Sequence, residues 1–431
     1  MNSCLTQTRS RHPLVSIAAL LGVAAALLLL ALPAHAAHTL KVLYDFTGGA
    51  DGGSPQYALI RDAAGNLYGA TATGGASGNG TVFELVNKTG TWSETVLYSF
   101  AGGTDGASPS GRLAMDSAGN LYGMTSAGGT HGVGTIYRLT SSGGTWTEKV
   151  LFSFPGFPSP SGGLILDAKG NLYGSTLSAG NPHCYHGCGL VFRLSLTKAL
   201  KWKYTILYRF LGHTKNDGEQ PTGDLVFDAA GNLYGTTFIG GTLGETGGMH
   251  GYGTVFELSL SGTTWTEKVL HNFAGATTDG SYPGAGVVFD KAGNLYTTTT
   301  GGGILNSACT GADGGCGVVV QFVPSGGTWT ENVIYQFTGG NDGADPDSVL
   351  TMDASGNLYG TAPQGGSKAG GVLYELSLSG GVWTQSVLHA FLGKPDGQQP
   401  EGGVIMDPAG NFYGTTFTGG AGNGTVYQVG P

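Results

Sequence analysis

The run His183-Cys184-Tyr185-His186-Gly187-Cys188 combines two thiols and two imidazoles within six residues. Two thiolates and two imidazoles are a donor set that zinc accepts in tetrahedral sites. Cys184 and Cys188 could equally form a disulfide inside one loop, and Cys309 and Cys316 form a second close pair. Close, even-numbered cysteines in an exported chain favour disulfides. We therefore predict the disulfides Cys184–Cys188 and Cys309–Cys316, and no resident metal or cofactor.

A second set of candidate residues interrupts a pattern that the rest of the chain repeats. After a recurring proline, most repeats place glycine within the two positions before a strand-like segment. The residues that intrude there are Tyr57, Arg112, Asp224, Asp347 and Glu401. An arginine beside carboxylates could hold an acidic sugar or polarise a glycosidic bond. Unselected surface variation would give the same exceptions, so both interpretations stay open.

Histidines on the longer loops complete the predicted ligand-binding set. His131 and His250 stand alone on such loops, and an isolated histidine could act as a general base near neutral pH. Neither belongs to a motif that contains a nucleophile, and no Gly-x-Ser-x-Gly elbow follows a strand and enters a helix. We include both histidines in the set and assign no catalytic residue.

Two further groups of aspartates are repeated and therefore point to structure. Six precede glycine in Asp-Gly-x-x-Pro segments, whereas the third repeat has Phe157 and Pro158 nearby; the six are Asp51, Asp105, Asp217, Asp279, Asp342 and Asp396. Seven begin Asp-x-x-Gly-Asn segments: Asp62, Asp116, Asp167, Asp228, Asp290, Asp353 and Asp407. Either group could bind cations. Aspartate followed by glycine is turn chemistry, and calcium loops carry more acids, so we favour turns.

A repeated scaffold must position all these residues. The segment Gly65-Asn66-Leu67-Tyr68-Gly69 recurs in six further versions, 51 to 63 residues apart. The later copies begin at Asn120, Asn171, Asn232, Asn294, Asn357 and Asn411. Regular recurrence at such intervals indicates a repeat architecture.

Each repeat contains four strand-like segments. In the first repeat they are 59–62, 66–71, 81–85 and 91–100, rich in β-branched and aromatic residues and bounded by glycine, asparagine or aspartate. No stretch after Ala36 sustains a helical period. Seven copies of four antiparallel strands predict an all-β fold, a seven-bladed β-propeller.

The chain ends predict how the ring closes. The last repeat stops after its third segment, 425–429, while an orphan segment, 40–46, resembles the end of the tryptophan-containing fourth segment, 96–100. Six tryptophans mark the complete copies: Trp92, Trp146, Trp202, Trp265, Trp329 and Trp383. The N-terminal strand should therefore supply the outer strand of the seventh blade.

Up-and-down strands distribute the loops between two faces. The Asp-Gly-x-x-Pro crossings and the loops between second and third strands should share one face, and the tight turns should occupy the other. Because loops on a rigid scaffold carry most binding residues, we place the site at the mouth of the central channel on the first face.

The N-terminus predicts export. Arg9 and Arg11 precede an apolar run, 14–32, and an Ala34-His35-Ala36 pattern, so residues 1–36 resemble a cleaved signal peptide before a single propeller domain, 37–431. An uncleaved membrane anchor is the alternative. Loss of the two arginines changes the net charge from −9 to −11. With no basic cluster, nucleic-acid binding is not expected, and we expect a monomer without stable membrane insertion.

The repeated motifs resemble a known family. Val-Leu-Tyr-x-Phe, Asp-Gly-x-x-Pro, Asp-x-x-Gly-Asn-Leu-Tyr-Gly-x-Thr and Gly-Thr-Val-Phe-Glu-Leu are similar to the GloVer (Gloeo/Verruco) tandem repeat of exported bacterial proteins, over nearly all of residues 39–431. The resemblance implies an extracellular location and no agreed activity. Some members carry a C-terminal surface anchor, and from the residues of this sequence we expect none.

Two classes of function follow from these features. The first is an exported, non-catalytic protein that binds an extracellular ligand or cell-surface component, with a glycan favoured by abundant tyrosine and tryptophan and few charges. The second is an extracellular polysaccharide lyase or glycoside hydrolase acting at the same channel mouth, a hypothesis by analogy of fold.

Overall fold

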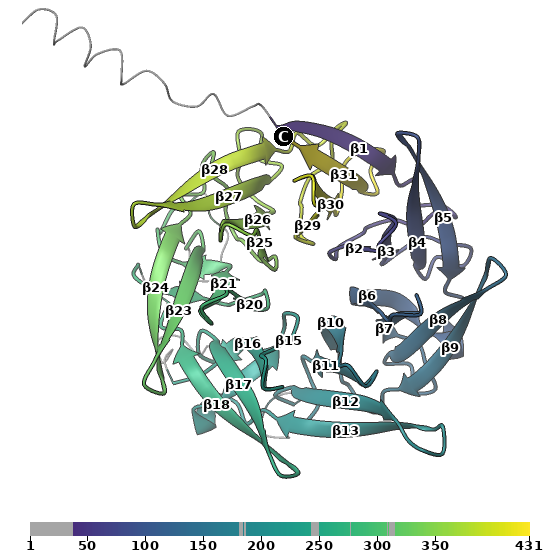
Figure 1. The fold of residues 1–431 in the computed structure, drawn as a ribbon, viewed down its shortest axis with the longest axis horizontal. Coiled ribbons are helices and arrows are strands. Elements are labelled where there is room, and N and C mark those ends of the chain that lie inside the picture. The colour runs from purple at the N-terminus through teal and green to yellow at the C-terminus, as the bar shows by residue number, and fades with distance from the viewer. Residues whose placement is uncertain are drawn as a thin grey trace, which may run out of the picture. The chain divides into compact units, whose positions relative to one another are not determined.

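The strands of each repeat form one blade, and the blades surround a central opening (Figure 1). A computed structural model describes residues 38–180, 184, 187–242, 250–275, 277–307, 309 and 315–431. The predicted signal peptide lies outside the described residues. The described part of the chain contains no helix with the length and apolar character needed to cross a bilayer.

The first three blades follow the predicted order from the centre outward. Blade 1 contains β2 (Ile60–Arg61), β3 (Leu67–Thr71), β4 (Thr81–Lys88) and β5 (Thr91–Ser99). Blade 2 contains β6 (Ala107–Met115), β7 (Leu121–Ala127), β8 (Thr135–Ser142) and β9 (Thr145–Ser153). Blade 3 contains β10 (Pro160–Leu166), β11 (Leu172–Thr176), β12 (Leu190–Leu196) and β13 (Trp202–Arg209).

The next two blades add short strands at their inner edges. Blade 4 contains β15 (Val226–Phe227), β16 (Leu233–Gly240), β17 (Thr254–Ser261) and β18 (Thr264–Asn272), and β14 (Gly218–Pro221) also pairs with β16. Blade 5 contains β20 (Val288–Phe289), β21 (Leu295–Thr299), β23 (Val318–Ser325) and β24 (Thr328–Gln336). Beside it, β19 (Gly280–Ser281) pairs with β22 (Gly301–Gly302). Two 3-10 turns, η1 (Gly103–Asp105) and η2 (His213–Lys215), precede blades 2 and 4.

The last two blades complete the ring as predicted. Blade 6 contains β25 (Thr351–Met352), β26 (Leu358–Ala362), β27 (Val372–Ser379) and β28 (Val382–Ala390). Blade 7 contains β29 (Val404–Met406), β30 (Phe412–Thr416), β31 (Thr425–Gly430) and β1 (Thr39–Asp45). The N-terminal β1 pairs antiparallel with the C-terminal β31, from Thr39 opposite Gly430 to Asp45 opposite Thr425. The predicted closure is confirmed.

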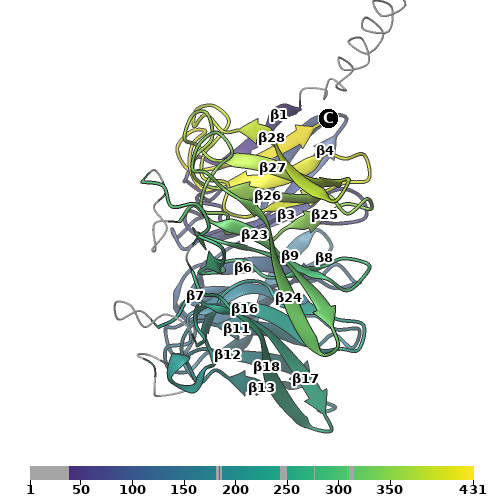
Figure 2. The same ribbon diagram turned by 90° about the vertical axis from the view of Figure 1, so that its left-hand side faces the viewer.

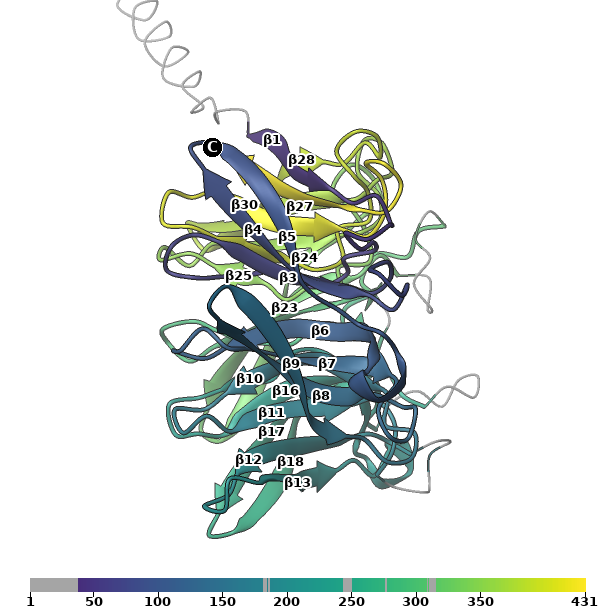
Figure 3. The same ribbon diagram turned by 90° about the vertical axis from the view of Figure 1, so that its right-hand side faces the viewer.

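Edge-on views separate the two faces of the ring. The hairpins that join third to fourth strands, such as those of β8–β9 and β17–β18, point to the same side (Figures 2 and 3). The Asp-x-x-Gly-Asn segments make the tight turns between first and second strands. In blade 2, Asp116 Oδ1 accepts hydrogen bonds from the amides of Ala118 and Asn120, each at 2.9 Å. Its Oδ2 accepts from Asn120 Nδ2 at 2.8 Å and from the Tyr122 hydroxyl at 3.0 Å, which confirms the structural interpretation.

The Asp-Gly-x-x-Pro acids have a structural role too. Asp51 Oδ2 accepts hydrogen bonds from the Thr47 amide at 2.8 Å and the Tyr44 hydroxyl at 3.1 Å. Asp396 repeats this with the Leu392 amide and His389 Nε2, which replaces the tyrosine. Each acid therefore fastens the end of an outer strand to the loop that enters the next blade, and the prediction of turn chemistry is confirmed.

Aromatic rings join every blade to its neighbour. The phenylalanine that ends Val-Leu-Tyr-x-Phe packs edge to face against an aromatic ring on the third strand of the next blade, and none of these rings is more than 1% exposed. The seven pairs are Phe46–Phe83, Phe100–Tyr137, Phe154–Phe192, Phe210–Phe256, Phe273–Phe322, Phe337–Tyr374 and Phe391–Tyr427, with centroids 4.9 to 6.1 Å apart. Such pairs contribute about 0.5–1.5 kcal/mol each beyond the burial of their area.

The glycine of Leu-Tyr-Gly makes room for these rings. A Cβ on Gly69 would lie 2.5 Å from Phe83 Cζ on the paired strand, so a larger residue would clash. Blade 5 shows the complementary case, because Thr297 replaces the glycine and faces Val320 instead of an aromatic ring. There the aromatic residue stands two positions later, at Phe322. The exception supports the packing explanation for the repeated glycine.

We predict that removal of β1 destabilises the ring. A chain truncated through Asp45 loses the outer strand of blade 7 and exposes unpaired edge groups of β31. We expect a loss on the order of 5 kcal/mol in the free energy of unfolding, comparable with the margin of a whole domain. Denaturant unfolding should be compared with a chain lacking only residues 1–37, which keeps β1. Equal stability of the two truncated chains would contradict strand closure.

We also predict that stability falls between about pH 5 and pH 8. Burial, followed by repulsion from a nearby aspartate, raises the pKa of Glu94 and Glu148 to about 7 and that of Glu267 to about 8. Because these pKa values are raised on folding, the stabilisation is present below the ordinary pKa of 4.5 and is lost as pH rises through the folded values. Melting temperatures should decline over this range, and less so when all three are glutamine. A melting temperature that rises with pH would contradict this.

Candidate functional site

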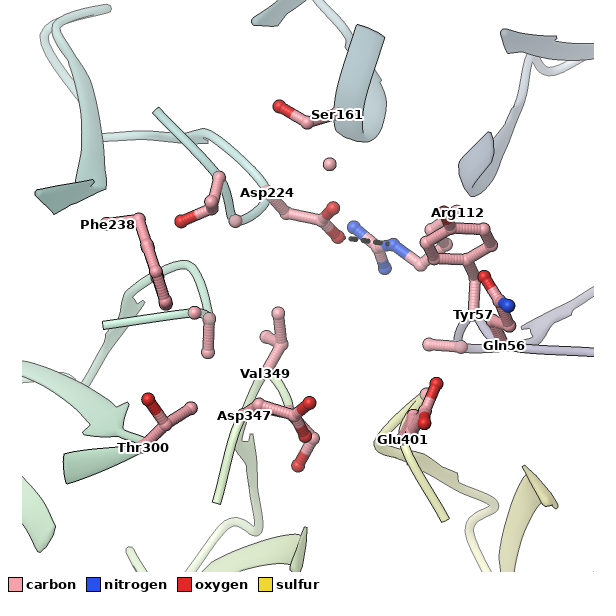
Figure 4. A pocket seen from close by; sticks show the side chains of 18 of the residues that line it. Gln56, Tyr57, Arg112, Ser161, Asp224, Phe238, Thr300, Asp347, Val349 and Glu401 are labelled. Carbon is pink, nitrogen blue, oxygen red and sulfur yellow. Dashed lines mark ion pairs between the residues drawn. The ribbon is translucent and has the colours of Figure 1, made fainter. Parts of the chain in front are cut away.

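A cavity of 580 Å³ lies at the centre of the ring, on the face of the crossing loops (Figure 4). Most of its lining comes from the three residues that follow each repeated proline. Glycines in these segments let the loops approach closely. A Cβ on Gly111 would lie 1.6 Å from the Gly162 carbonyl oxygen of blade 3, and one on Gly223 would lie 1.9 Å from the Gly286 amide nitrogen of blade 5.

Hydroxyl groups tie these loops together on one side of the cavity. The residue directly after the proline donates from its side chain to the proline carbonyl of the next blade. Ser161 Oγ donates to Pro221 at 2.8 Å, and Thr222 Oγ1 donates to Pro283 at 3.0 Å. Asp347 and Glu401 hold the same sequence position in blades 6 and 7. A carboxyl group can donate such a hydrogen bond only when it is protonated, so these two positions depart from the pattern of the hydroxyl residues.

Arg112 of blade 2 and Asp224 of blade 4 meet in the cavity as an ion pair (Figure 4). Arg112 Nε lies 2.8 Å from Asp224 Oδ2, and the side chains are 35% and 13% exposed. The other carboxylate oxygen of Asp224 accepts a short hydrogen bond from the Gly163 amide. The charge of the arginine is therefore already compensated within the protein.

Asp347 and Glu401 form an acidic side of the cavity. Burial, strengthened by repulsion from Glu401, raises the pKa of Asp347 to about 8. Asp347 Oδ1 is enclosed by protein, with no hydrogen-bond partner among the residues that the structure describes. Burial also raises the pKa of Glu401 and of Tyr57; for Tyr57 the Gly111 amide opposes the shift. At neutral pH, Asp347 thus combines a carbonyl acceptor with a hydroxyl donor.

The cavity brings together five of the seven residues predicted to bind ligand: Tyr57, Arg112, Asp224, Asp347 and Glu401. The two histidines do not line it. His131 is exposed and its Nδ1 lies 3.1 Å from Thr130 Oγ1, while His250 Nδ1 lies 3.1 Å from His213 Nδ1 at the edge of blade 4. A ligand-binding role for all seven remains a prediction.

Some lining residues that the sequence did not predict lie at the ends of the second strands or directly after them. Leu177, Phe238 and Thr300 each come directly after the last residue of the Leu-Tyr-Gly-x-Thr segment or its variant. The same position holds Ala72, Ser126, Pro363 and Phe417 in the other repeats. This position varies between repeats while the residues before it recur, and this contrast could have identified it from the sequence as a lining position.

Both predicted disulfides are present. Cys184–Cys188 and Cys309–Cys316 each have Cα atoms 5.1 Å apart. Sulfur atoms joined in this way are not thiolates, so the hypothesis of a zinc site with two cysteine ligands is wrong. His183 and His186 lie outside the described residues. Two disulfides are typical of a protein from an oxidising compartment, such as the periplasm or the exterior.

Comparison with known proteins identifies the repeat. The sequence matches the Gloeobacter/Verrucomicrobia repeat over residues 33–246 and 244–431. A search of the curated proteins found no match.

Solved structures with TM-scores of 0.50 and 0.54 share the fold at low identity. A polysaccharide lyase of family PL25, an ulvan lyase bound to a GlcA(1-4)Rha3S segment, is 11% identical, with 91% of this chain and 95% of that chain covered and a TM-score of 0.54. A candidate 6-phosphogluconolactonase from Bacteroides uniformis is 16% identical, with 81% and 88% covered and a TM-score of 0.50. A gluconolactonase from Xanthomonas campestris is 16% identical, with 75% and 85% covered and a TM-score of 0.40.

We predict that the cavity ion pair contributes little to stability. Arg112→Ala should lower the free energy of unfolding by less than about 1 kcal/mol, because the pair is partly exposed and Asp224 keeps its bond to the Gly163 amide. Asp116→Ala, in a repeated turn, should cost about 1–2 kcal/mol through four lost hydrogen bonds. Denaturant titrations would check both values, and the opposite order would refute the distinction between turn and cavity residues.

Proposed function

The chain belongs to the Gloeobacter/Verrucomicrobia repeat family, and we propose that it is an exported protein that binds a neutral glycan in the central cavity. The observation that carries this proposal is the charge arrangement of the lining. Arg112 is the only basic side chain among the described lining residues, and it is already paired with Asp224. Asp347 and Glu401 add acidic groups without a compensating cation.

This arrangement disfavours an acidic sugar. A uronate or sulfate group in the cavity would compete with Asp224 for Arg112 and would face the Glu401 carboxylate. Like charges held close together in a partly buried site repel one another more strongly than they do in water. The earlier hypothesis that the arginine holds a carboxylate sugar therefore loses its support, and a neutral polyhydroxyl ligand is favoured.

The polar groups suit sugar hydroxyls, which both donate and accept hydrogen bonds. Glu401 offers carboxylate acceptors, and the raised pKa of Asp347 leaves it a donor near neutral pH. Tyr57 and Phe238 add aromatic surface to the lining, on which a sugar ring could pack. A cavity of 580 Å³ also lies within the usual range for small-ligand sites, about 300–1,000 Å³.

The two carboxyl groups also support a second candidate, a glycoside hydrolase. An acid that stays protonated near neutral pH can give its proton to the leaving oxygen, while a second carboxylate acts as base or nucleophile. Asp347 would be the proton donor and Glu401 its partner. The lyase alternative has less support, because neither His131 nor His250 lines the cavity.

An array of neutral and uronate-containing polysaccharides tests the proposal, with both retention of the protein and release of reducing ends recorded. We expect retention on neutral glycans. Glu401→Gln should weaken it about tenfold or more, since hydrogen bonds to charged groups are worth about 1.5–3 kcal/mol, and Asp347→Ala should weaken it by removing both a donor and an acceptor. Release of reducing ends that Asp347→Asn abolishes would instead establish the hydrolase.

His131→Ala provides the matched control, because His131 lies on the same face but does not line the cavity. This variant should bind as the wild type does. Retention on uronate glycans alone, or unchanged binding by both carboxyl variants, would contradict the proposed site.

A further inference from the structure

A cluster of two histidines and one glutamate lies on blade 4, outside the central cavity. It is on the face of the ring that carries the crossing loops, called the loop face below. His213 belongs to η2, Glu219 belongs to β14, and His250 precedes the third strand of the blade. Their side chains converge, since His250 Nδ1 lies 3.5 Å from Glu219 Oε2, His213 Nδ1 lies 3.8 Å from it, and the two Nδ1 atoms are 3.1 Å apart. One atom from each residue therefore faces a common point.

Glu219 is the decisive member because it is buried. Its side chain is 4% exposed, and Oε2, the oxygen aimed at both imidazoles, has no hydrogen-bond partner in the described part of the chain. An ionised carboxylate in such a place needs compensation by a cation or by several hydrogen bonds. A neutral imidazole supplies no positive charge, and ring nitrogens at 3.5 and 3.8 Å are too distant for strong hydrogen bonds.

The other repeats show that blade folding does not require this glutamate. Its position, two residues before the repeated proline, holds Gly53, Ala107, Pro158, Ser281, Ala344 and Gln398 elsewhere. The neighbouring Gly212 leaves room for the disulfide and for Glu219. A Cβ at this position would lie 2.7 Å from Cys184 Sγ and 3.3 Å from Glu219 Oε2. The disulfide thus supports one side of the loop that carries His213.

A second acid and histidine cluster, His271 with Asp279 and Glu331, provides the contrast. His271 occupies the position of the repeated tyrosine that pairs with the Asp-Gly-x-x-Pro acid, as His389 does with Asp396. Glu331 occupies the position of Glu94, Glu148 and Glu267. This cluster is therefore a version of the contact between the outer strand and the Asp-Gly-x-x-Pro acid that other blades also make. His213, Glu219 and His250 have no counterpart of this kind in the other repeats.

We propose that His213, Glu219 and His250 bind a zinc(II) ion at the edge of the loop face. Two imidazole nitrogens and one carboxylate oxygen are a common zinc donor set. Donors placed about 2.1 Å from a tetrahedral ion lie roughly 3.4 Å apart, close to the three separations in this cluster. Zinc would supply the positive charge that the buried carboxylate needs. Three protein ligands leave a fourth position for water or a ligand atom, as in zinc sites that exchange their fourth ligand.

Zinc titration of the untagged, full-length protein tests this proposal after treatment with a chelator and dialysis. We expect one zinc ion per chain and a higher melting temperature with zinc, but not with calcium or magnesium, which prefer oxygen ligands. Glu219→Gln and His250→Ala should each weaken zinc binding at least tenfold. His250 is exposed, so its replacement should leave the metal-free melting temperature unchanged.

Two variants serve as matched controls. His131 holds the same loop position in blade 2 as His250 holds in blade 4, and Glu331 belongs to the second cluster. His131→Ala and Glu331→Gln should both bind zinc as the wild type does. The proposal is overturned if micromolar zinc does not bind saturably, if Glu219→Gln and His250→Ala retain full affinity, or if Glu331→Gln loses it.

Discussion

The edge-to-face contact between neighbouring blades is the interaction on which this ring depends. A phenylalanine at the end of each outer strand packs against an aromatic residue of the next blade, and all seven joints are buried. Each joint needs space on the adjacent strand, which explains the glycine after Leu-Tyr or Phe-Tyr in six blades and the Thr297–Val320 pair in the fifth. The same outer strands carry the tyrosine or histidine that fixes the crossing loop through its aspartate. Because these contacts hold the scaffold, residues at the tips of the crossing loops are free to differ between blades.

This division explains what the sequence could predict. The number of strands, ring closure by β1 and the role of both aspartate groups follow from the repetition of the sequence motifs. A residue that recurs in every blade has a structural role that every blade requires. Exceptions to the recurrence identified Tyr57, Arg112, Asp224, Asp347 and Glu401 before their cavity was known. The repeated motifs do not predict which of the residues that depart from them lie close together in the folded protein. Phe238 and Glu219 stand at variable positions without a motif, and His213 and His250 are 37 residues apart in sequence. Their proximity depends on loop conformation, which local patterns do not determine.

The loop face consequently carries two groups of exceptional residues with different chemistry. In the cavity, a compensated arginine and two carboxyl groups of raised pKa favour hydrogen bonding to a neutral polyhydroxyl ligand. At the edge of blade 4, a buried carboxylate between two imidazoles favours a metal ion. The two groups share no residue, so ligand binding in the cavity and zinc binding at the edge are separable properties. The likeness to the ulvan lyase, at 11% identity, shows a common fold alone.

We propose that the exceptional residues of the crossing loops form the ligand site, and a crystal structure of the protein with a retained neutral oligosaccharide would test this. We predict a sugar in the central cavity, with hydroxyl groups about 2.6–3.0 Å from the carboxyl oxygens of Asp347 and Glu401. A sugar bound to the outer strands, or to the face that carries the Asp-x-x-Gly-Asn turns, would contradict it.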